Sequence, residues 1–306
     1  MREAWLPLAV LGALAAAPLV GFGGSYETTL MARAMILGVA AVSLAFLVGG
    51  AGLVSLGHAA SLGIGAYAVA ILDAHGVTQA AFVLPVAIGA AAAFALLTGA
   101  VAIRTSGVHF IMITLAFGQM AFFTASSLAA YGGDDGYTLY SRTEIAGTRL
   151  LENRLAFHYI CLGALALTWA TCAMLLASRF GRVLRAAREN AQRVEAVGLA
   201  PYPFRLVGYT LAGAMGGLAG FLLANATEFV SPATLSWQRS GELLFMVILG
   251  GAARLWGAIL GALVFVLLET WLAQQMQHWK LVFGPLLVLA VIFLRGGLAG
   301  LVARRG

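Results

Sequence analysis

The chain alternates long apolar runs with short polar connections over almost its whole length. Several of these runs approach or exceed the roughly 20 residues that a helix needs to cross a bilayer. We therefore predict an all-α polytopic membrane protein with about ten transmembrane helices, some of them short or broken. The predicted spans are residues 6–22, 30–48, 53–72, 82–103, 108–130, 157–178, 206–225, 242–253, 256–272 and 281–295.

The stretch 242–272 is the least regular part of this pattern. It is too long for one ordinary span, and GGAARLWG at 250–257 indicates a break between two short helices; a single long span is the alternative. Paired glycines are poor helix formers, so Gly49-Gly50 and Gly250-Gly251 are the places where we expect helices to break or move.

A weak internal similarity links two parts of the chain. LGHAASL at 56–62 and LGGAARL at 249–255 share five of seven residues. Transporters are often built from duplicated halves, so an internal duplication is one hypothesis. Chance similarity between helices rich in glycine and alanine is the other.

The first residues can be interpreted in two ways. Arg2, an apolar run and Ala15-Ala16-Ala17 resemble a cleaved signal peptide. The alternative is a first spanning helix that stays in the protein, and we favour it because many more spans follow.

Composition excludes a soluble globular domain. The sequence is 61% hydrophobic and 10% charged, whereas soluble domains carry roughly 25% charge. The net charge of +6 does not indicate nucleic-acid binding, because the basic residues are not interleaved with aromatic residues for base stacking. Ten crossings would put both termini on the side that holds the arginine-rich segment 179–205, and positive residues favour the cytoplasm.

Small residues follow helical spacing in the later part of the chain. Ala212, Gly216 and Gly220 form one four-residue ladder, and Gly213 with Gly217 forms another beside it. In lipid, small residues let helix backbones approach closely. These ladders therefore predict tight helix packing.

Few polar residues lie within the predicted spans. Such groups tend to face the bundle interior or a cavity, so His58, Ser61, Thr114 and Gln119 are candidates for the lining of a substrate pathway. The alternative is that they form hydrogen bonds between helices. Two carboxylates, Glu242 and Glu269, are predicted near the outer interface, where solvent or an arginine can hold them.

Enzyme signatures are missing from the sequence. There is no HExxH, no GxSxG, no Cys/His cluster of the kind that binds metal and no GxxxxGK[ST] phosphate loop. We therefore predict no catalytic residues, no metal site and no cofactor in this chain.

Two connections are long enough to be more than turns. Residues 131–156 are predicted outside and hold four acids, Asp134, Asp135, Glu144 and Glu152. Residues 179–205 are predicted inside, with four arginines and two glutamates between residues 181 and 199.

The inner connection has the pattern of one amphipathic helix that ends at Gly198. Its apolar stripe is Leu184, Ala187, Ala191, Val194 and Gly198, and its polar face is Arg182, Arg185, Glu189 and Arg193. Arg185 and Glu189 are spaced for an i,i+4 ion pair. Position alone leaves three hypotheses: a helix on the membrane surface, a solvated loop, or a docking helix for a cytoplasmic partner.

Five segments in order resemble one transporter family. They are SLGHAASLGIGAYAVAIL (55–72), GVHFIMITLAFGQM (107–120), GGDDGY (132–137), GRVLRAARENAQRVEAVGL (181–199) and SGELLFMVILGG (240–251). The chain resembles the permease subunits of branched-chain amino acid ABC importers, of the LivM type. It departs from their pattern at Gly241, at Ala253-Arg254 and at Ala258.

The resemblance implies a single transmembrane permease domain over residues 1–306 of a bacterial inner-membrane transporter. Such permeases pair with a second, related permease, two cytoplasmic ATPase subunits that hold ATP and Mg, and a periplasmic or extracellular substrate-binding protein. Asp134 and Asp135 would lie in the loop that contacts the binding protein, with 226–240 as a second candidate contact.

The segment 181–199 resembles the loop that couples such permeases to their ATPases. The resemblance carries Glu195, Ala196 and Gly198 onto the core of that motif, and Arg185, Arg188, Glu189 and Asn190 onto the charged segment before it. The expected function is import of branched-chain or other hydrophobic amino acids by alternating access. The alternatives are import of urea or short amides, or an ion-coupled secondary transporter with a membrane-buried carboxylate.

Overall fold

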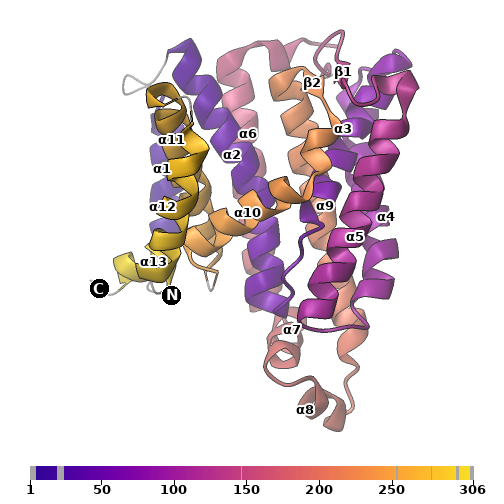
Figure 1. Cartoon of the computed structure of the whole chain (residues 1–306), viewed down its shortest axis with the longest axis vertical. Coiled ribbons are helices and arrows are strands. Elements are labelled where there is room, and N and C mark those ends of the chain that lie inside the picture. The colour runs from indigo at the N-terminus through magenta and orange to yellow at the C-terminus, as the bar shows by residue number, and fades with distance from the viewer. Residues whose placement is uncertain are drawn as a thin grey trace.

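A computed structural model describes residues 5–18, 24–145, 147–252, 254–276, 278–293 and 296–303. These residues form thirteen α-helices that build an elongated bundle (Figure 1). The helices are α1 Trp5–Ala16, α2 Ser25–Phe46, α3 His58–Ala74, α4 Ala80–Ala102, α5 Val108–Ser127, α6 Arg154–Ala177, α7 Arg179–Glu189, α8 Ala191–Ala196, α9 Pro201–Thr227, α10 Trp237–Gly250, α11 Leu255–Gln275, α12 Trp279–Phe293 and α13 Gly297–Ala303. Shorter elements are the π-helical turn η1 Leu47–Ala51, the 3₁₀ turns η2 Ala129–Tyr131, η3 Leu150–Glu152 and η4 Pro232–Leu235, and the strands β1 Tyr137–Thr138 and β2 Phe229–Val230.

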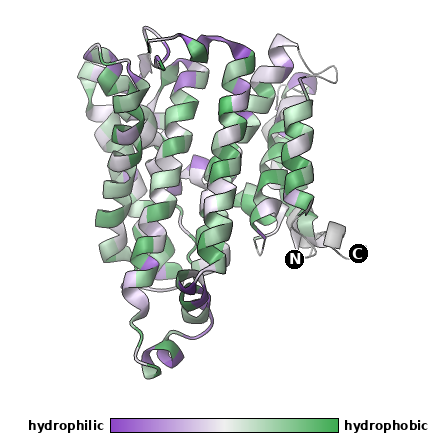
Figure 2. Ribbon diagram, turned by 180° about the vertical axis from the view of Figure 1, so that it is seen from behind, coloured by the Kyte–Doolittle hydropathy of each residue, from purple (hydrophilic) through white to green (hydrophobic). Residues whose placement is uncertain are grey.

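A helix lies over each of the ten predicted apolar runs, so the polytopic all-helical prediction is confirmed. Among the described residues, six segments are long and apolar enough to cross a membrane: α2 with η1, α4, α5, α6, α9 and α11. The helices α1, α3, α10 and α12 are shorter, so the count of about ten crossings stays a prediction. Hydrophobic residues cover the long helices and hydrophilic ones gather at the two ends of the bundle (Figure 2).

The predicted break in the stretch 242–272 is confirmed. α10 ends at Gly250, and Gly251 follows with a φ of 108°, a conformation that only glycine adopts readily. α11 then begins at Leu255 and is a full-length helix rather than a short one. α10 lies obliquely across the middle of the bundle (Figure 1).

A second break precedes α3, where we expected a span over 53–72. The π-helical turn η1 contains Gly49 and Gly50, and Gly52 follows in the left-handed conformation with a φ of 69°. Residues 52–57 are therefore non-helical, and α3 starts only at His58. The expectation was wrong for this first part because apolar composition does not register the π-helical turn and the left-handed glycine.

The two breaks touch each other. A Cβ atom placed on Gly49 would lie 2.6 Å from the carbonyl oxygen of Ala252, which is closer than real Cβ contacts. Only glycine therefore lets η1 approach the connection between α10 and α11. A displacement of η1 would therefore displace the connection between α10 and α11 as well.

The structure does not support a duplication at the similar heptapeptides. Residues 58–62 open α3, whereas residues 249–250 end α10 and the following residues leave the helix. The same letters thus occupy a helix start in one case and a helix end in the other. Duplication elsewhere in the chain stays a hypothesis.

The glycine ladders of α9 pack against two helices, as predicted. Gly216 and Gly220 face α3, and Gly213 and Gly217 face α4. A Cβ on Gly220 would lie 2.0 Å from the Leu62 carbonyl oxygen. The backbones of α3 and α9 therefore meet without intervening side chains.

Replacing Gly220 with alanine is expected to destabilise the bundle by about 1–3 kcal/mol, since neither backbone can give way to the added methyl group. Gly163→Ala on α6 is the matched control, because a Cβ there meets no atom within 4 Å. We expect the melting temperature of Gly163→Ala in detergent to equal or exceed that of the wild type, and that of Gly220→Ala to be lower. Equal melting temperatures for Gly220→Ala and wild type would contradict the close α3–α9 contact.

The N-terminal helix α1 packs against α6. The His158 imidazole Nε2 lies 3.0 Å from the Leu14 carbonyl oxygen, and the Tyr159 hydroxyl donates to the Ala15 carbonyl oxygen over 3.4 Å. Leu14 and His158 are both buried. Arg2 lies outside the described residues, and retention of this segment stays a prediction.

Candidate functional site

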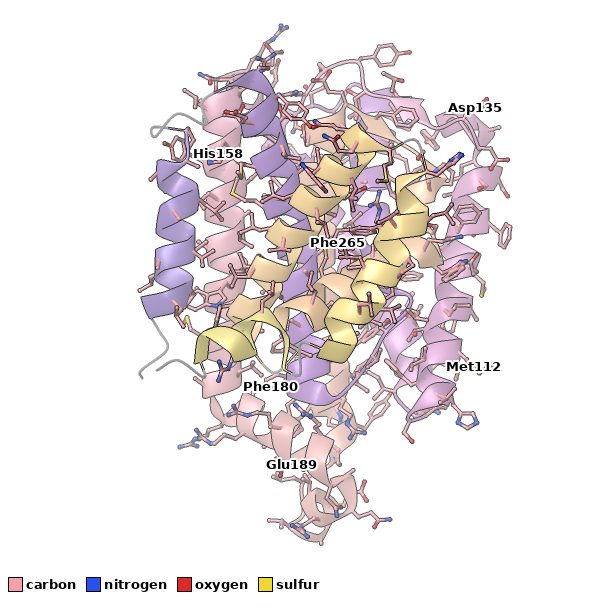
Figure 3. All side chains as sticks on the ribbon, turned by 60° about the vertical axis from the view of Figure 1, so that its left-hand side comes forward. Met112, Asp135, His158, Phe180, Glu189 and Phe265 are labelled. Atoms are coloured by element: carbon pink, nitrogen blue, oxygen red, sulfur yellow. The ribbon has the colours of Figure 1, made fainter. Side chains whose placement is uncertain are left out.

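The charged segment 179–205 projects from one end of the bundle, and the loop 131–156 lies at the opposite end. Figure 1 shows α7 and α8 below the bundle and β1 with β2 above it. In Figure 3, Glu189 and Asp135 mark these two ends. The structure thus separates the two candidate docking regions by the full length of the helices.

The charged segment is two short helices and not the single helix that we expected. Asn190 has extended backbone angles (φ −157°, ψ 102°), and its side-chain oxygen accepts a hydrogen bond from the Arg193 amide over 3.0 Å. Asn190 therefore ends α7 and caps α8. The apolar stripe survives the break in part: Leu184, Ala187 and Val194 are buried, whereas Gly198 is exposed.

The predicted stop at Gly198 is confirmed. Gly198 has a φ of 86°, its amide donates to the Glu195 carbonyl oxygen, and the Leu199 amide donates to the Val194 carbonyl oxygen. This pair of bonds is the Schellman arrangement that closes a helix with a left-handed glycine. α8 is therefore a short helix capped at both ends.

Three arginines of α7 face the bundle and donate to its backbone. Arg185 donates to the Leu176 carbonyl oxygen over 3.0 Å, and Arg182 to that of Ala177 over 3.4 Å, so both satisfy the last turn of α6. Arg188 donates to the Gly49 carbonyl oxygen in η1. The ion pair expected between Arg185 and Glu189 is absent from the described residues, because Arg185 reaches the α6 terminus instead.

A groove of about 350 Å³ lies between α7 and α8. Its apolar residues are partly exposed; the Val197 side chain, for example, is 77% exposed although it is hydrophobic. The lining residues are Arg182, Val183, Ala186, Glu189, Asn190, Arg193, Val194, Val197 and Leu199. Of the coupling residues that the resemblance supplied, Glu189 and Asn190 line this groove.

The other coupling candidates lie around the groove. Glu195, Ala196 and Gly198 are exposed on α8, whereas Arg185 and Arg188 fasten α7 to the bundle. Sequence reasoning missed Val197 and Leu199. Their signal is two large apolar residues beside a helix stop in an otherwise charged segment.

The outer loop is folded onto the second candidate contact, 226–240. β1 pairs antiparallel with β2, and Tyr137 lies opposite Val230. Arg142 forms an ion pair with Glu228 at 2.6 Å, and the Thr143 amide donates to the Asn225 side chain over 2.8 Å. The two segments therefore form one surface.

Asp73 at the end of α3 anchors this loop, which sequence reasoning missed. Its carboxylate accepts hydrogen bonds from the Tyr140 amide over 3.0 Å and from the Tyr137 hydroxyl over 3.3 Å. Burial, together with the Asp73 charge, raises the pKa of the Tyr137 phenol above its ordinary value. The hydrogen bond and the shift both reflect the close approach of the Tyr137 hydroxyl to the Asp73 carboxylate.

Asp134 and Asp135 are exposed in the tight turn that precedes β1. Gly132, Gly133 and Gly136 around them have positive φ values, which lets the chain make this tight turn. Of the other two acids, Glu144 and Glu152 both lie beside Arg149, at 3.8 and 3.7 Å. The free carboxylates of this loop are thus concentrated at its tip.

The four pathway candidates lie on two helices, His58 and Ser61 on α3 and Thr114 and Gln119 on α5. The His58 imidazole Nε2 lies 2.8 Å from the Ser43 hydroxyl, and the Thr114 hydroxyl donates to the Ile111 carbonyl oxygen while accepting from the Leu56 amide. Ser61 is buried against the glycines of α9, and the Gln119 Nε2 is buried without a hydrogen-bond partner. These contacts are also those of hydrogen bonding and packing within the bundle, so the pathway role of the four residues stays a prediction.

The start of α3 meets the start of α10 inside the bundle. The Ala59 amide donates to the Ser240 hydroxyl over 3.0 Å, and both residues are fully buried. Gly57 packs against Thr114, the seventh residue of α5, which lies about 9 Å from the helix end beside the charged segment. Both helix starts therefore lie within the depth of the long helices.

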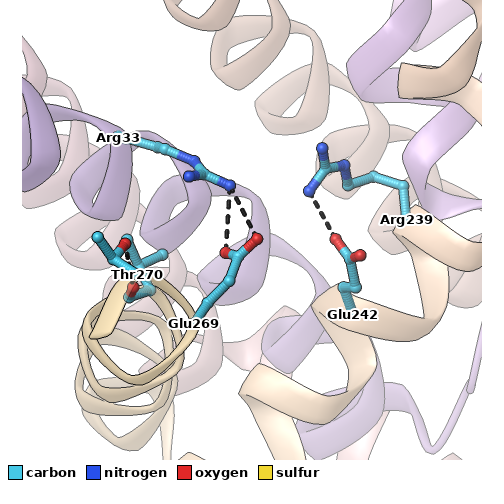
Figure 4. Close-up of polar contacts among 6 residues, drawn as sticks. Arg33, Arg239, Glu242, Glu269 and Thr270 are labelled. Atoms are coloured by element: carbon cyan, nitrogen blue, oxygen red, sulfur yellow. Dashed lines mark hydrogen bonds and ion pairs between the residues drawn. The ribbon is translucent and has the colours of Figure 1, made fainter. Parts of the chain in front are cut away.

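Glu242 and Glu269 are each paired with an arginine, as expected. Arg33 on α2 contacts Glu269 on α11 at 3.1 Å, and Arg239 contacts Glu242 within α10 at 2.5 Å (Figure 4). Glu242 lies two residues after Ser240 and is therefore deep in the bundle. This corrects the expected position near the outer interface, because α10 begins inside the bundle and not at its surface.

Metal-binding clusters of three or more His, Cys, Asp or Glu side chains are absent from the part of the chain that the structure describes. The candidate site therefore consists of the α7–α8 groove, the surface of the outer loop and the charged pairs inside the bundle.

Comparison with known proteins gives a consistent result. A family model described as "Branched-chain amino acid transport system / permease component" matches residues 27–292. The high-affinity branched-chain amino acid transport system permease protein LivM of Escherichia coli K12 is 27% identical over 287 residues, covering 86% of this chain and 68% of that protein. LivM of Salmonella typhimurium is 27% identical over 314 residues, covering 95% and 73%.

A relative with a different cargo also matches. The autoinducer 2 import system permease protein LsrC of Klebsiella pneumoniae is 29% identical over 157 residues, which cover 47% of this chain and 46% of that protein. No solved structure matches the chain significantly.

The family match covers most of the chain, including α2 through most of α12. It identifies a multi-pass permease component of an ABC-type system, without ATPase activity of its own, and so argues against the ion-coupled secondary transporter that the sequence left open. The chain belongs to the family of permease components of branched-chain amino acid transport systems.

Proposed function

We propose that this chain is the permease subunit of an ABC importer that moves branched-chain or other hydrophobic amino acids across the bacterial inner membrane by alternating access. The observation that carries the proposal is the exposed groove between α7 and α8, with Val197 at its edge. A hydrophobic side chain held in water at a capped helix end fits a protein contact. Since the sequence lacks a phosphate loop, the fitting partner is a separate ATPase.

The groove residues and their neighbours would couple this ATPase to the permease. Glu189, Asn190, Glu195, Ala196 and Gly198 would meet the ATPase surface. Arg185 and Arg188 would transmit its movement, because they fasten α7 to α6 and to η1. ATP and Mg would be held by the ATPase subunits, and this chain needs no cofactor for its part.

A mechanical route continues from η1 into the bundle. Arg188 holds the Gly49 carbonyl, and Gly49 packs against Ala252 at the end of α10. A displacement of α7 would therefore shift the break between α10 and α11, and with it the oblique helix α10. Proline and glycine beside α8 would supply the hinges.

The opposite end would receive the substrate-binding protein. Asp134 and Asp135 are exposed in the outer loop, and the pairing of β1 with β2 joins this loop to residues 226–240. One protein could therefore contact both segments. We place this end in the periplasm and the charged segment, with both termini, in the cytoplasm, following the distribution of arginines. A second, related permease would complete the pathway.

The cargo is the least constrained part of the proposal. Relatives include permeases of branched-chain amino acid systems and of an autoinducer 2 import system. Import of urea or short amides is the runner-up within the family. The sequence of this chain does not decide between these cargoes, because the external binding protein, a different chain, would set the selectivity.

Purification of the chain from its native membrane tests the proposed assembly. We expect a P-loop ATPase and a second permease to copurify in mild detergent, and the ATPase to separate when residues of the groove are altered. Recovery of this chain as a transporter that works alone would contradict the proposal.

A further inference from the structure

Arg239 and Glu242 form an ion pair that packing does not explain. The pair spans one turn of a single helix, α10, so it joins no two parts of the fold. The comparable pair Arg33–Glu269 links α2 to α11 and braces two helices (Figure 4). A structural role is thus evident for the second pair and absent for the first.

The depth of this pair makes its presence costly. Ser240, the residue after Arg239, caps the buried start of α3 within the depth of the long helices. Charged side chains at such depth are unfavourable in lipid and mark pathways for solutes or ions. Arg239 and Glu242 therefore require an environment other than hydrocarbon.

The pair is also open on one side. The side chains of Arg239 and Glu242 are 27% and 38% exposed, although their neighbours Ser240 and Leu243 are fully buried. Gly241 lies between them, and a Cβ placed on it meets no atom within 4 Å. α10 thus presents two opposite charges on one partly exposed face, while the open space at Gly241 lies on another side of the helix.

We propose that Arg239 and Glu242 form a transit site for the zwitterionic head group of the transported amino acid. The proposal rests on the function proposed above and adds the place where the solute is recognised. The α-carboxylate would accept hydrogen bonds from Arg239, and the α-ammonium would donate to Glu242. Each charge would exchange one partner for another, so neither would lose its pairing as the solute passes.

Recognition of this kind fits a permease that discriminates little between the side chains of the amino acids it transports. The two charges read only the groups that all α-amino acids share. A neutral amide such as urea would offer no pair of opposite charges to the site. The arrangement therefore favours amino acids over the runner-up cargo.

The test uses the complete transporter in proteoliposomes, with radiolabelled leucine uptake and ATP hydrolysis measured together. We compare the wild type with Glu242→Gln and with the double variant Arg239→Gln/Glu242→Gln, which leaves no charge unpaired. The expected result is a loss of about tenfold in leucine transported per ATP, while hydrolysis stimulated by the loaded binding protein stays within about twofold of wild type. The matched control is Arg33→Gln/Glu269→Gln, which removes the bracing pair and is expected to lower stability without changing leucine transported per ATP.

Other outcomes separate the site from the function. If the double variant transports leucine per ATP as well as wild type, the pair is structural and the transit site is wrong. If the control variant loses transport per ATP as strongly as the double variant, general loss of intramembrane charge is the cause, which also overturns the site. If the wild-type transporter shows no ATP-dependent leucine uptake, the proposed function itself fails.

Discussion

Replacing Val197 with aspartate is expected to abolish ATP-driven uptake by the assembled transporter while the permease stays folded in its membrane. Val197 is 77% exposed at the edge of the α7–α8 groove, so its side chain contributes little to the fold of this chain. Docking would bury it. An aspartate buried there without a partner would weaken the contact by about 2 kcal/mol or more, which is over tenfold in affinity.

The measurement is the amount of ATPase that copurifies with the variant, together with uptake in the same membranes. Gln192→Asp is the matched control: it adds the same charge to an exposed position of α8 outside the groove lining. We expect the control to stay within about twofold of wild type, the range of an ordinary surface substitution. Full ATPase association of Val197→Asp would exclude the groove as the docking surface.

Arg188→Ala is expected to separate ATP hydrolysis from transport. The exposed Arg188 side chain reaches from α7 to the Gly49 carbonyl in η1 and does not line the groove, so its loss leaves the groove in place for the ATPase. The link from α7 to η1, and through Gly49 to the end of α10, would be missing. We predict hydrolysis near the wild-type rate with uptake reduced by about tenfold, since a lost hydrogen bond to a charged group costs roughly 1.5–3 kcal/mol.

The ratio of solute transported to ATP hydrolysed measures this separation. Arg179→Ala is the control, because Arg179 is exposed at the start of α7 and lines no part of the groove. A normal ratio for Arg188→Ala would show that movement reaches the bundle by another route. A parallel loss of hydrolysis and uptake would place Arg188 in the docking surface instead.

Apolar runs predicted the helical architecture well, because burial in lipid demands long hydrophobic stretches with satisfied backbones. Paired glycines also located the break between α10 and α11. Gly49-Gly50 likewise marked the break at η1, but the path of the non-helical segment between η1 and α3 could not be predicted from the sequence. Its path is held by tertiary contacts: the Leu56 amide donates to Thr114, and Gly57 packs on the backbone of α5.

Prediction of the candidate site was less complete, for physical reasons. The helix stop at Gly198 could be predicted because glycine readily adopts the left-handed conformation that closes a helix, and the structure confirms it. The continuous amphipathic stripe predicts one helix through Asn190, whereas the structure breaks the helix there, with Asn190 capping α8. Arg185 could pair with Glu189 by spacing, yet the unsatisfied end of α6 takes it instead.

Polar residues inside the spans were the hardest to interpret from sequence. His58 and Ser61 are pathway candidates because they are polar in an apolar run. Their neighbours are Ser43 and the glycines of α9, which the sequence does not reveal. The expected position of Glu242 near the surface was wrong, because its depth depends on where α10 begins and the sequence does not show this. The hydrogen bond between Ser240 and Ala59, far apart in the chain, sets that depth.

The central claim is that this chain moves its solute only when a separate ATPase drives it. Uptake of radiolabelled leucine into proteoliposomes tests it most directly, with the permease pair, the ATPase subunits and the binding protein present or omitted one at a time. We predict uptake that requires ATP on the side of α7 and α8 and that disappears when the ATPase or this chain is omitted. Uptake by this chain alone, driven by an ion gradient without ATP, would contradict it.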